Sequence, residues 1–432
     1  MANTQQSPSE NIIYDWPAVE VTGDITMFKQ VPQQAGNLGP NQTLSFQIAS
    51  RTEFVDIQRS YLQFSLTPIG PTGNCYMNTI GASSIVGQVQ ETVCGTSLQF
   101  LNRYELYQAT RNAVASRSRK DFITQTEGFV ESGLVTANPG VELTNGSTYE
   151  FVIPCPLQTI TTNKLVPLSL FPGDYLIQIL LNPVSYVFSK LGTTNATSYT
   201  ISNVYLCLAL VTPPRELYLQ AMNTLNNGGD ILLPISVCRN FEQNLAAGVN
   251  ISFNQIIGYY ESLNAITICK RRATDITDGF VSCPETVSLD SWYIALDTER
   301  FPRNRSINAE GNSQATNFTN GTVTQRGSSE NLLQIIRPFN TQLDDKTPYQ
   351  VSGITSDASL GINSGFCYWN FEENSSFGSG KAVANGQFVA YLTYNPTAIT
   401  AGTSDVYDVF IEYSIMLRIT AGGISFNSGT YA

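Results

Sequence analysis

The sequence contains no histidine among its 432 residues. A Ser-His-Asp or Cys-His nucleophile system therefore cannot be built from this chain. A zinc site of the His-Glu-x-x-His type is excluded for the same reason. So is a pH switch near neutrality that works through an imidazole ring. Several of the common routes to hydrolytic catalysis are thus closed.

Charged residues are also scarce, at 13% of the chain, where about a quarter is usual. Amides, hydroxyls and glycines take their place, and such a surface suits a protein that buries much of its exterior against partners. The formal net charge of −11 excludes binding to nucleic acid by bulk positive charge. Residues 1–12 hold no Lys or Arg, so a basic genome-binding arm is absent there. We expect no direct, sequence-specific binding of nucleic acid.

The eight cysteines include no Cys-x-x-Cys pair, which argues against a zinc ribbon or a redox motif. Cys94, Cys207 and Cys269 lie in apolar strand patterns and are predicted to be small buried residues. We expect free thiols in a reducing compartment. The sequence shows neither a basic-then-apolar leader nor a run of 18 apolar residues, so we expect no secretion signal and no transmembrane helix.

What is present in abundance is alternation, most clearly in residues 407–420. One set of alternate residues is apolar: Val409, Ile411, Tyr413, Ile415, Leu417 and Ile419. The other set is mixed: Asp408, Phe410, Glu412, Ser414, Met416, Arg418 and Thr420. A period of two places the sets on opposite faces of a strand. The pattern predicts a long, half-buried strand, and similar patterns recur in both halves of the chain.

The length exceeds what one hydrophobic core usually covers, so two domains are expected. A boundary follows the apolar run 204–211, where Pro213 is typical of a first helical position. Leu217, Ala221 and Leu225 would form the apolar face of that short helix. Asn and Gly residues then end it, which places the junction at about residue 226. We predict an N-terminal arm over 1–24, a first sandwich over 25–226 and a second over 227–432.

Each half is predicted to hold roughly eight short strands and one interrupting helix. In the first half strands are expected near 43–48, 61–67, 85–93, 149–153, 175–181 and 199–211, with a helix over 100–116. In the second they are expected near 231–238, 251–253, 265–269, 292–296, 388–394 and 406–420, with a short helix over 328–336. This is the content of an all-β protein made of two eight-stranded jelly-roll β-sandwiches in tandem, with a few short helices in connecting loops.

Two long polar stretches, 303–327 and 353–386, are predicted to be surface or interface loops. They contain aromatic residues that need burial somewhere: Phe318, Phe366, Tyr368, Trp369 and Phe371. An interface role is therefore favoured over disorder.

No catalytic, cofactor-binding or metal-binding residue is assigned. The acid pairs Asp344–Asp345 and Glu372–Glu373 are adjacent, so on an extended chain they point to opposite faces and do not converge. The segment 378–380 is not followed by a helix, so it is no phosphate cradle. The segment 275–279 lacks the spacing of a calcium loop.

Basic residues cluster at 270–272 and 117–120, with Arg300, Arg303 and Arg305 as a looser group. Each cluster could face a lipid or nucleic-acid interior. We favour charges at the ends of strands and helices that are solvated or paired with acids. Residues 117–120 fall at the end of the predicted helix over 100–116, where positive charge suits the helix dipole.

Several segments, taken in order, carry a resemblance to a known family. They are 54–66, 83–95 with the tyrosines of 104–107, 168–174 with 175–181, 292–297 with Pro302, and 407–420. This layout resembles the double jelly-roll major capsid proteins of double-stranded DNA viruses, and most closely their polinton-like virus, adintovirus and virophage branch. It departs from them at the loops 303–327 and 353–386, and at the strand tip Cys94–Gly95.

The resemblance implies a structural protein that self-assembles as a homotrimer. Six jelly rolls would then form a pseudo-hexagonal capsomer that tiles the icosahedral capsid of a virion. The implied partners are the chain itself, neighbouring capsomers, and penton and minor capsid proteins, while contact with an inner membrane is left open. The implied location is the virion, assembled inside the host cell and not secreted.

Two other functions remain open at this point. A carbohydrate-binding or carbohydrate-active β-sandwich protein could stack sugars on Tyr368 and Trp369. A viral or cell-surface spike or fibre domain is also compatible with sandwiches and polar loops, although the sequence has no repetitive shaft.

Overall fold

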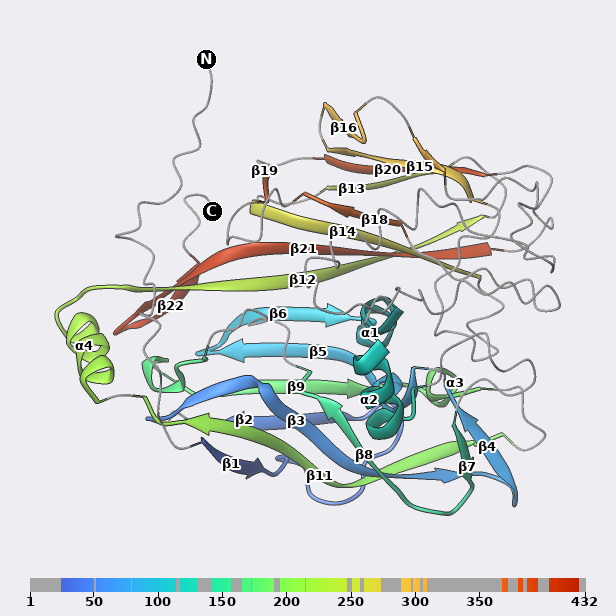
Figure 1. The fold of residues 1–432 in the computed structure, drawn as a ribbon, viewed down its shortest axis with the longest axis horizontal. Helices are drawn as coiled ribbons and strands as arrows, with labels where there is room; N and C mark the ends of the chain where they lie inside the picture. Colours follow the sequence, from blue (N-terminus) through green and yellow to red (C-terminus); the bar gives the residue numbers. More distant parts are fainter. Residues whose placement is uncertain are drawn as a thin grey trace.

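The structure is a computed structural model of the chain. It describes residues 25–49, 52–78, 80–113, 117–129, 141–156, 165–171, 173–189, 195–213, 215–246, 251–256, 260–272, 289–296, 298–303, 306–308, 367–371, 380–383, 387–394 and 404–426. Within these residues strands dominate, and they form four large sheets that follow one another from the bottom to the top of Figure 1.

The first half of the chain folds into a two-sheet sandwich. One sheet has the order β1 (Ile25–Gln30), β11 (Ser198–Val211), β3 (Phe54–Ile69) and β8 (Tyr149–Pro154). The other has the order β2 (Thr43–Ile48), β9 (Tyr175–Leu181), β5 (Val86–Val93) and β6 (Thr96–Asn102). A small sheet of β10 (Phe188–Ser189), β4 (Asn74–Met77) and β7 (Glu142–Thr144) closes one end. Alternate residues such as Leu62, Phe64 and Leu66 are buried between the sheets, as a period of two requires.

The second half repeats the plan. One sheet has the order β12 (Ile231–Ala246), β21 (Ser404–Thr420), β14 (Tyr260–Arg272) and β18 (Cys367–Asn370), with β19 (Lys381–Val383) on β14 and β22 (Gly423–Phe426) on β21. The other has the order β13 (Ile251–Ile256), β20 (Gln387–Tyr394), β15 (Leu289–Leu296) and β16 (Glu299–Phe301), with β17 (Ile307–Asn308) on β15. Trp292 and Ile294 of β15 are buried in its core.

Both halves share one topology. When the eight principal strands of a half are numbered along the chain, one sheet always has the order 1-8-3-6 and the other 2-7-4-5. Every neighbouring pair along these orders is antiparallel. This is the jelly-roll arrangement, built twice, and the predicted fold class is confirmed.

Helices join or cover the strands. They are α1 (Tyr104–Ala113), α2 (Arg117–Glu127), α3 (Val184–Val187) and α4 (Arg215–Asn226), with single 3₁₀ turns at Gly81–Ile85 and Leu168–Leu170. Helix α4 links β11 to β12 and buries Ala221 and Leu225, as its sequence pattern predicts. No helix in the described part of the chain is long and apolar enough to cross a membrane.

The single helix predicted over 100–116 is wrong in its bounds. Strand β6 continues to Asn102, so Phe100 lies in a strand, and α1 begins at Tyr104 after Arg103 takes a positive φ of 58°. A second helix, α2, begins at Arg117. The basic residues from 117 therefore start a helix instead of ending one, and the favourable dipole argument for them is reversed.

The two stretches predicted as loops also contain strands. Residues 307–308 form β17, and the stretch 353–386 contributes β18 and β19. Tyr368 and Phe371 are buried against the second core, so the expected burial is confirmed for these two, whereas Phe318 and Phe366 lie outside the described residues. The helix predicted over 328–336 and the rest of these stretches lie outside the described residues.

Candidate assembly interfaces

Strand β21 is buried on both of its faces. From Val406 to Leu417 every residue is buried except Glu412, which is half-buried. The prediction of a half-buried strand is therefore wrong for most of its length. Its apolar set faces the second core, and its other set, which includes Asp408, Phe410 and Glu412, meets the first half of the chain.

Helix α1 of the first sandwich covers this outer face of β21. The rings of Tyr107 and Phe410 lie 5.6 Å apart in a tilted arrangement. Both side chains are buried, and burial raises the pKa of the Tyr107 hydroxyl well above its ordinary value. An aromatic pair of this kind adds about 1 kcal/mol to the burial of its area.

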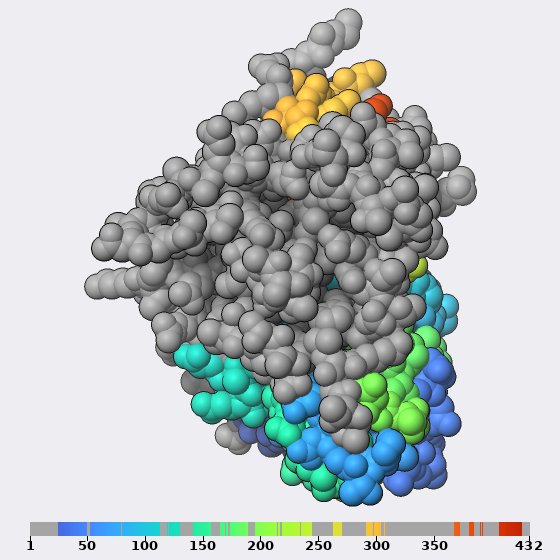
Figure 2. All heavy atoms as spheres, turned by 90° about the vertical axis from the view of Figure 1, so that its right-hand side faces the viewer, coloured from blue at the N-terminus to red at the C-terminus, as the bar shows by residue number. Residues whose placement is uncertain are grey.

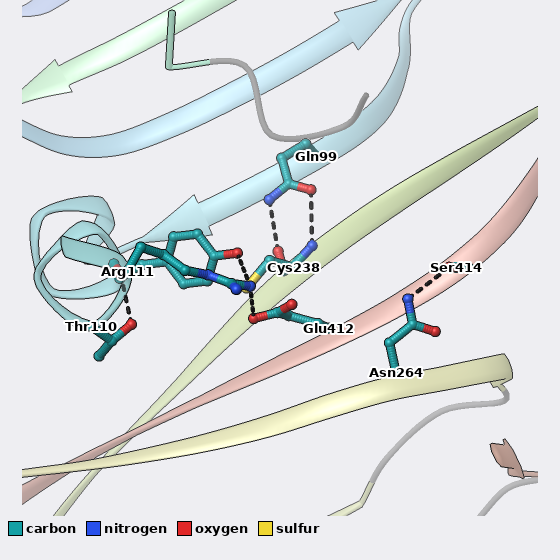
Figure 3. Close-up of polar contacts among 8 residues, drawn as sticks. Gln99, Thr110, Arg111, Cys238, Asn264, Glu412 and Ser414 are labelled. Carbon is teal, nitrogen blue, oxygen red and sulfur yellow. Dashed lines mark hydrogen bonds and ion pairs between the residues drawn. The ribbon is translucent and has the colours of Figure 1, made fainter. Parts of the chain in front are cut away.

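Arg111, one turn further along α1, pairs with Glu412 of β21 (Figure 3). Its Nη2 also donates a hydrogen bond of 2.8 Å to the hydroxyl of Tyr107. Burial alone would lower the pKa of Arg111, but the Glu412 carboxylate raises it more, so the pKa ends well above its usual value. The guanidinium therefore stays charged and ties the two sandwiches together.

Gln99 of β6 completes the free edge of the second sandwich. Its Nε2 donates to the carbonyl of Cys238 at 2.8 Å, and the N–H of Cys238 donates to its Oε1 at 3.2 Å (Figure 3). Strand β12 lies at the end of its sheet, so these two backbone groups have no strand beside them within the described residues. The amide of Gln99 thus takes the place of a neighbouring strand.

A second pair of charges lies at the start of α1, where Arg103 precedes the helix and Glu105 is in its first turn. Arg103 Nη2 is 3.0 Å from Glu105 Oε1, and both side chains are largely buried. The guanidinium also lies over the ring of Tyr186 at 4.3 Å. Burial acts to lower the pKa of Arg103. The carboxylates of Glu105 and Asp408 raise it by more than burial lowers it, so the pKa lies above its usual value. Asp408 belongs to β21, so this interaction again crosses between the sandwiches.

The junction is complementary in charge. The first sandwich supplies Arg103 and Arg111, and the second supplies Asp408 and Glu412. Aromatic packing and a bidentate amide lie between them. Such a surface holds the two sandwiches in one orientation. Among the described residues no group of acids and cysteines is arranged to hold a metal ion.

The two sandwiches use different surfaces at this junction. The first contributes β6 and α1, which are its fifth strand and the helix after it. The second contributes β12 and β21, its first and last strands. A contact between non-equivalent surfaces of two similar bodies is heterologous, and within the described residues the complementary surface of each body is not used in this contact.

One unused surface is the outer face of β1 and β11 in the first sandwich. Ile25 and Met27 are exposed there, and Lys29 lies over the ring of Tyr205 at 5.0 Å. Since Phe28 packs against the core, the alternate residues Ile25, Met27 and Lys29 face outward.

The other unused surface is the outer sheet of the second sandwich. Tyr293 and Tyr391 stack with ring centroids 4.4 Å apart and planes at 15°, and Arg300 covers Tyr293 at 3.8 Å. Figure 2 shows the residues of β15 to β17 in orange towards the top of the molecule and the first sandwich, blue to green, at the bottom. The two unused surfaces therefore lie at opposite ends of the stack of sheets.

A buried acid lies at the C-terminal end of α2, away from the junction of the two sandwiches. Glu127 ends the helix and accepts a hydrogen bond from the hydroxyl of Ser83 in the 3₁₀ turn. Burial raises its pKa to about 7, although Ser83 and Arg119 both act to lower it. Gly81 permits this approach, since a Cβ there would lie 2.2 Å from the carbonyl oxygen of Glu127.

Other residues considered from the sequence lie apart from the junction. Cys207 and Cys269 are buried as predicted, but Cys94 is exposed at the turn between β5 and β6, so that prediction is wrong. The described residues contain no disulfide. Arg300 stacks on Tyr293, and residues 270–272 end β14.

The aromatic pair considered for sugar stacking is not available as a platform. Tyr368 is buried, and Trp369 packs against the second core with Phe301 6.2 Å from it. The acid pairs at 344–345 and 372–373, the segment 275–279 and Arg305 lie outside the described residues.

Sequence reasoning missed the residues that join the sandwiches. Arg111 lies in the stretch predicted as one helix over 100–116 and Gln99 lies just before that stretch, and nothing in the local sequence marks either residue. The sequence of β21 did contain a signal. Asp408, Phe410 and Glu412 lie on one face of the strand, and a large aromatic side chain between two acids is not what a face exposed only to solvent would favour.

Comparison with known proteins gives structural matches but no sequence matches. No family model matches the chain, and no curated protein matches it in sequence. The PBCV-1 protein Vp54, as fitted into a reconstruction of the virophage Sputnik, is 13% identical with a TM-score of 0.58, covering 94% of this chain and 97% of that one.

Two further structures give the same result. A chain of the Sputnik virophage is 12% identical with a TM-score of 0.56, covering 99% of this chain and 93% of its own. The Faustovirus major capsid protein is 10% identical with a TM-score of 0.53, covering 92% and 90%. Likeness at such identity concerns the fold: the chain has the double jelly-roll fold of viral capsid proteins.

Proposed function

We propose that this chain is a major capsid protein that self-assembles into homotrimers and builds the icosahedral capsid of a double-stranded DNA virus. The fold supports this, because the chain matches capsid proteins over more than nine-tenths of its length. The observation that carries the proposal is the heterologous junction between the two sandwiches. Repeated from chain to chain, such a contact forms a ring if its rotation closes.

Three chains give a ring of six sandwiches. Each chain already contains one of the contacts, between α1 and β21, and has one further surface of each kind at the opposite ends of the stack of sheets. Closing the ring therefore requires three further contacts of the same kind between chains. A near-sixfold unit made from one gene can tile a flat facet, which is the geometry that an icosahedral shell needs.

We also propose the finer features of this role. The chain acts by assembly and not by catalysis, and its location is the virion after assembly inside the host cell. Its partners beyond neighbouring capsomers are penton and minor capsid proteins. The division of the chain falls at helix α4, with an N-terminal arm over 1–24 and sandwiches over 25–226 and 227–432. In support, no sheet within the described residues combines strands from both sides of α4.

Electron microscopy of the purified full chain tests the proposal. Class averages viewed down the symmetry axis should show a hexagonal outline with threefold symmetry. Single two-lobed particles of one chain, at all protein and salt concentrations tried, would contradict it. Sugar binding has no residue-level support in the structure, since Tyr368 is buried and Trp369 packs against the core.

A further inference from the structure

Two Asn-Gly dipeptides lie in the described part of the chain, Asn145–Gly146 and Asn227–Gly228. In such a dipeptide the backbone nitrogen of the glycine can attack the side-chain amide carbon of the asparagine, because no glycine side chain shields that nitrogen. The reaction needs an asparagine amide that turns freely and a glycine N–H that leaves its hydrogen bond. The surroundings of the two dipeptides therefore decide which of them reacts.

The first dipeptide is held by a distant segment of the first sandwich. The Nδ2 of Asn145 donates a hydrogen bond of 2.8 Å to the carbonyl of Pro71, which lies 74 positions away in the chain. The backbone N–H of Asn145 donates to the carbonyl of Gly73 at 3.0 Å, and that of Gly146 donates to Pro68 at 2.8 Å. The amide and the attacking nitrogen are therefore freed only when the two segments separate.

The second dipeptide directly follows helix α4 and is exposed. Among the described residues the carboxamide of Asn227 takes part in no hydrogen bond, and Gly228 has a φ of 78° with open space where a side chain would be. The N–H of Gly228 donates to the carbonyl of Leu225 at 3.1 Å, and that of Gly229 donates to Thr224 at 2.9 Å. Both bonds close the last turn of α4 and reach no other element, so they open when the helix end frays.

We propose that Asn227 is a site of spontaneous deamidation. Hydroxide takes the proton of the Gly228 nitrogen, this nitrogen bonds to the side-chain amide carbon of Asn227, and ammonia leaves. Water then opens the cyclic imide at one of the two C–N bonds of the ring. Opening on the side-chain side gives aspartate, and opening on the backbone side gives isoaspartate. One water is consumed and one ammonia is released, with no oxidant or reductant.

The product changes the segment that links the two sandwiches. Helix α4 lies at one end of the sheets and joins β11 to β12 (Figure 1). The new carboxylate lies at the C-terminal end of this helix, where the helix dipole makes negative charge unfavourable. It also precedes Asp230, whose carboxylate pairs with Arg418 of β21. Isoaspartate adds a carbon atom to the main chain and so disrupts the bonds from Gly228 and Gly229. The end of α4 therefore loosens as the protein ages, whatever the function of the chain.

Peptide mapping of the purified full chain during incubation at pH 8 tests the proposal. Trypsin places Asn227 in the peptide 216–239 and Asn145 in the peptide 121–164, so one digest reports both sites. Mass spectrometry should show deamidation of Asn227 at least about tenfold faster than that of Asn145, because the latter must also break a long-range side-chain hydrogen bond. In urea, which unfolds both segments, the two rates should become similar. Equal rates in the folded protein, or an unchanged Asn227, would overturn the proposal.

Two matched variants test the effect on the link. Asn227→Gln keeps an uncharged amide but has to close a larger ring, so it should stop the reaction. Amide hydrogen exchange over residues 224–229 should quicken as the unchanged chain ages and stay constant in this variant. Asn145→Gln should age as the unchanged chain does. Exchange that quickens equally in all three proteins would refute the assignment of the change to Asn227.

Discussion

The outer faces of β12–β21 and of β1–β11 come from the same place in two similar sandwiches, yet within the described residues only the first is covered by the other sandwich. On β21 that face carries Asp408, Phe410 and Glu412, which meet cations and an aromatic ring. On β11 it carries Cys207, Ala209 and Val211, which are small and already buried, so they offer little for a specific contact with the other sandwich.

The difference shows how duplicated sandwiches become distinct. A face that is always covered can hold buried charge, because its partner is part of the same molecule and always present. A face that stays open until chains meet carries apolar residues on a soluble subunit, as Ile25 and Met27 do. The predictions that follow change one face at a time, from the largest expected effect to the smallest.

Phe410→Ala should lower the free energy of unfolding by about 4 kcal/mol, because a fully buried aromatic side chain is lost from a packed junction. Tyr205→Ala on the outer face of β11 should cost about 1 kcal/mol, since Tyr205 is half-buried and contacts Lys29. Urea unfolding below the concentration at which chains associate compares the two. Equal costs would mean that the junction of the two sandwiches adds no packing of its own.

Glu412→Ala should cost about 3 kcal/mol, because it removes the carboxylate that pairs with the largely buried guanidinium of Arg111. Replacing both residues, by Arg111→Met with Glu412→Leu, should recover most of that loss. The exposed pair of Lys381 and Glu299 is the control, and Glu299→Ala should cost less than about 1 kcal/mol. A double variant as unstable as the sum of its single changes would refute the coupling.

Glu127 is a buried acid that, unlike Glu412, lies outside the junction. At the end of α2 it accepts a hydrogen bond from the hydroxyl of Ser83. Its pKa of about 7 exceeds the ordinary value of 4.5, so between these pH values the folded chain binds more protons than the unfolded one. Stability from this group is complete below pH 4.5 and is lost as pH rises through about 7, a change of roughly 3 kcal/mol.

Glu127→Gln keeps the hydrogen bond from Ser83 and removes the titration. Thermal unfolding of both proteins from pH 4 to pH 8 should therefore show a gap that widens with pH in favour of the variant. Parallel curves would show that this carboxyl titrates as it does in the unfolded chain.

Gln99→Ala should cost about 2 kcal/mol, because it leaves the N–H and carbonyl of Cys238 without partners at a covered edge. Gln90→Ala in the adjacent strand β5 removes the same side chain from a half-buried position and should change stability by less than about 0.5 kcal/mol. Equal losses of unfolding free energy in the two variants would show that the amide of Gln99 does not stabilise the junction.

The sequence allowed the fold class to be predicted, because alternation in strands such as β9 and β21 follows from side-chain burial within the strand itself. Long-range contacts were out of reach. Whether the second face of β21 is wet or covered depends on α1, which lies some 300 positions earlier in the chain, and the ion pair of Arg111 and Glu412 spans that separation. Local patterns also failed at Arg103, where a positive φ separates β6 from α1.

The mass of the purified chain in solution tests the central claim most directly. Multi-angle light scattering should give three times 47.3 kDa, with no dimer populated on dilution, because a ring of heterologous contacts closes only when the third chain is in place. A mass of 47.3 kDa at every concentration, or an open series of growing oligomers, would contradict the account.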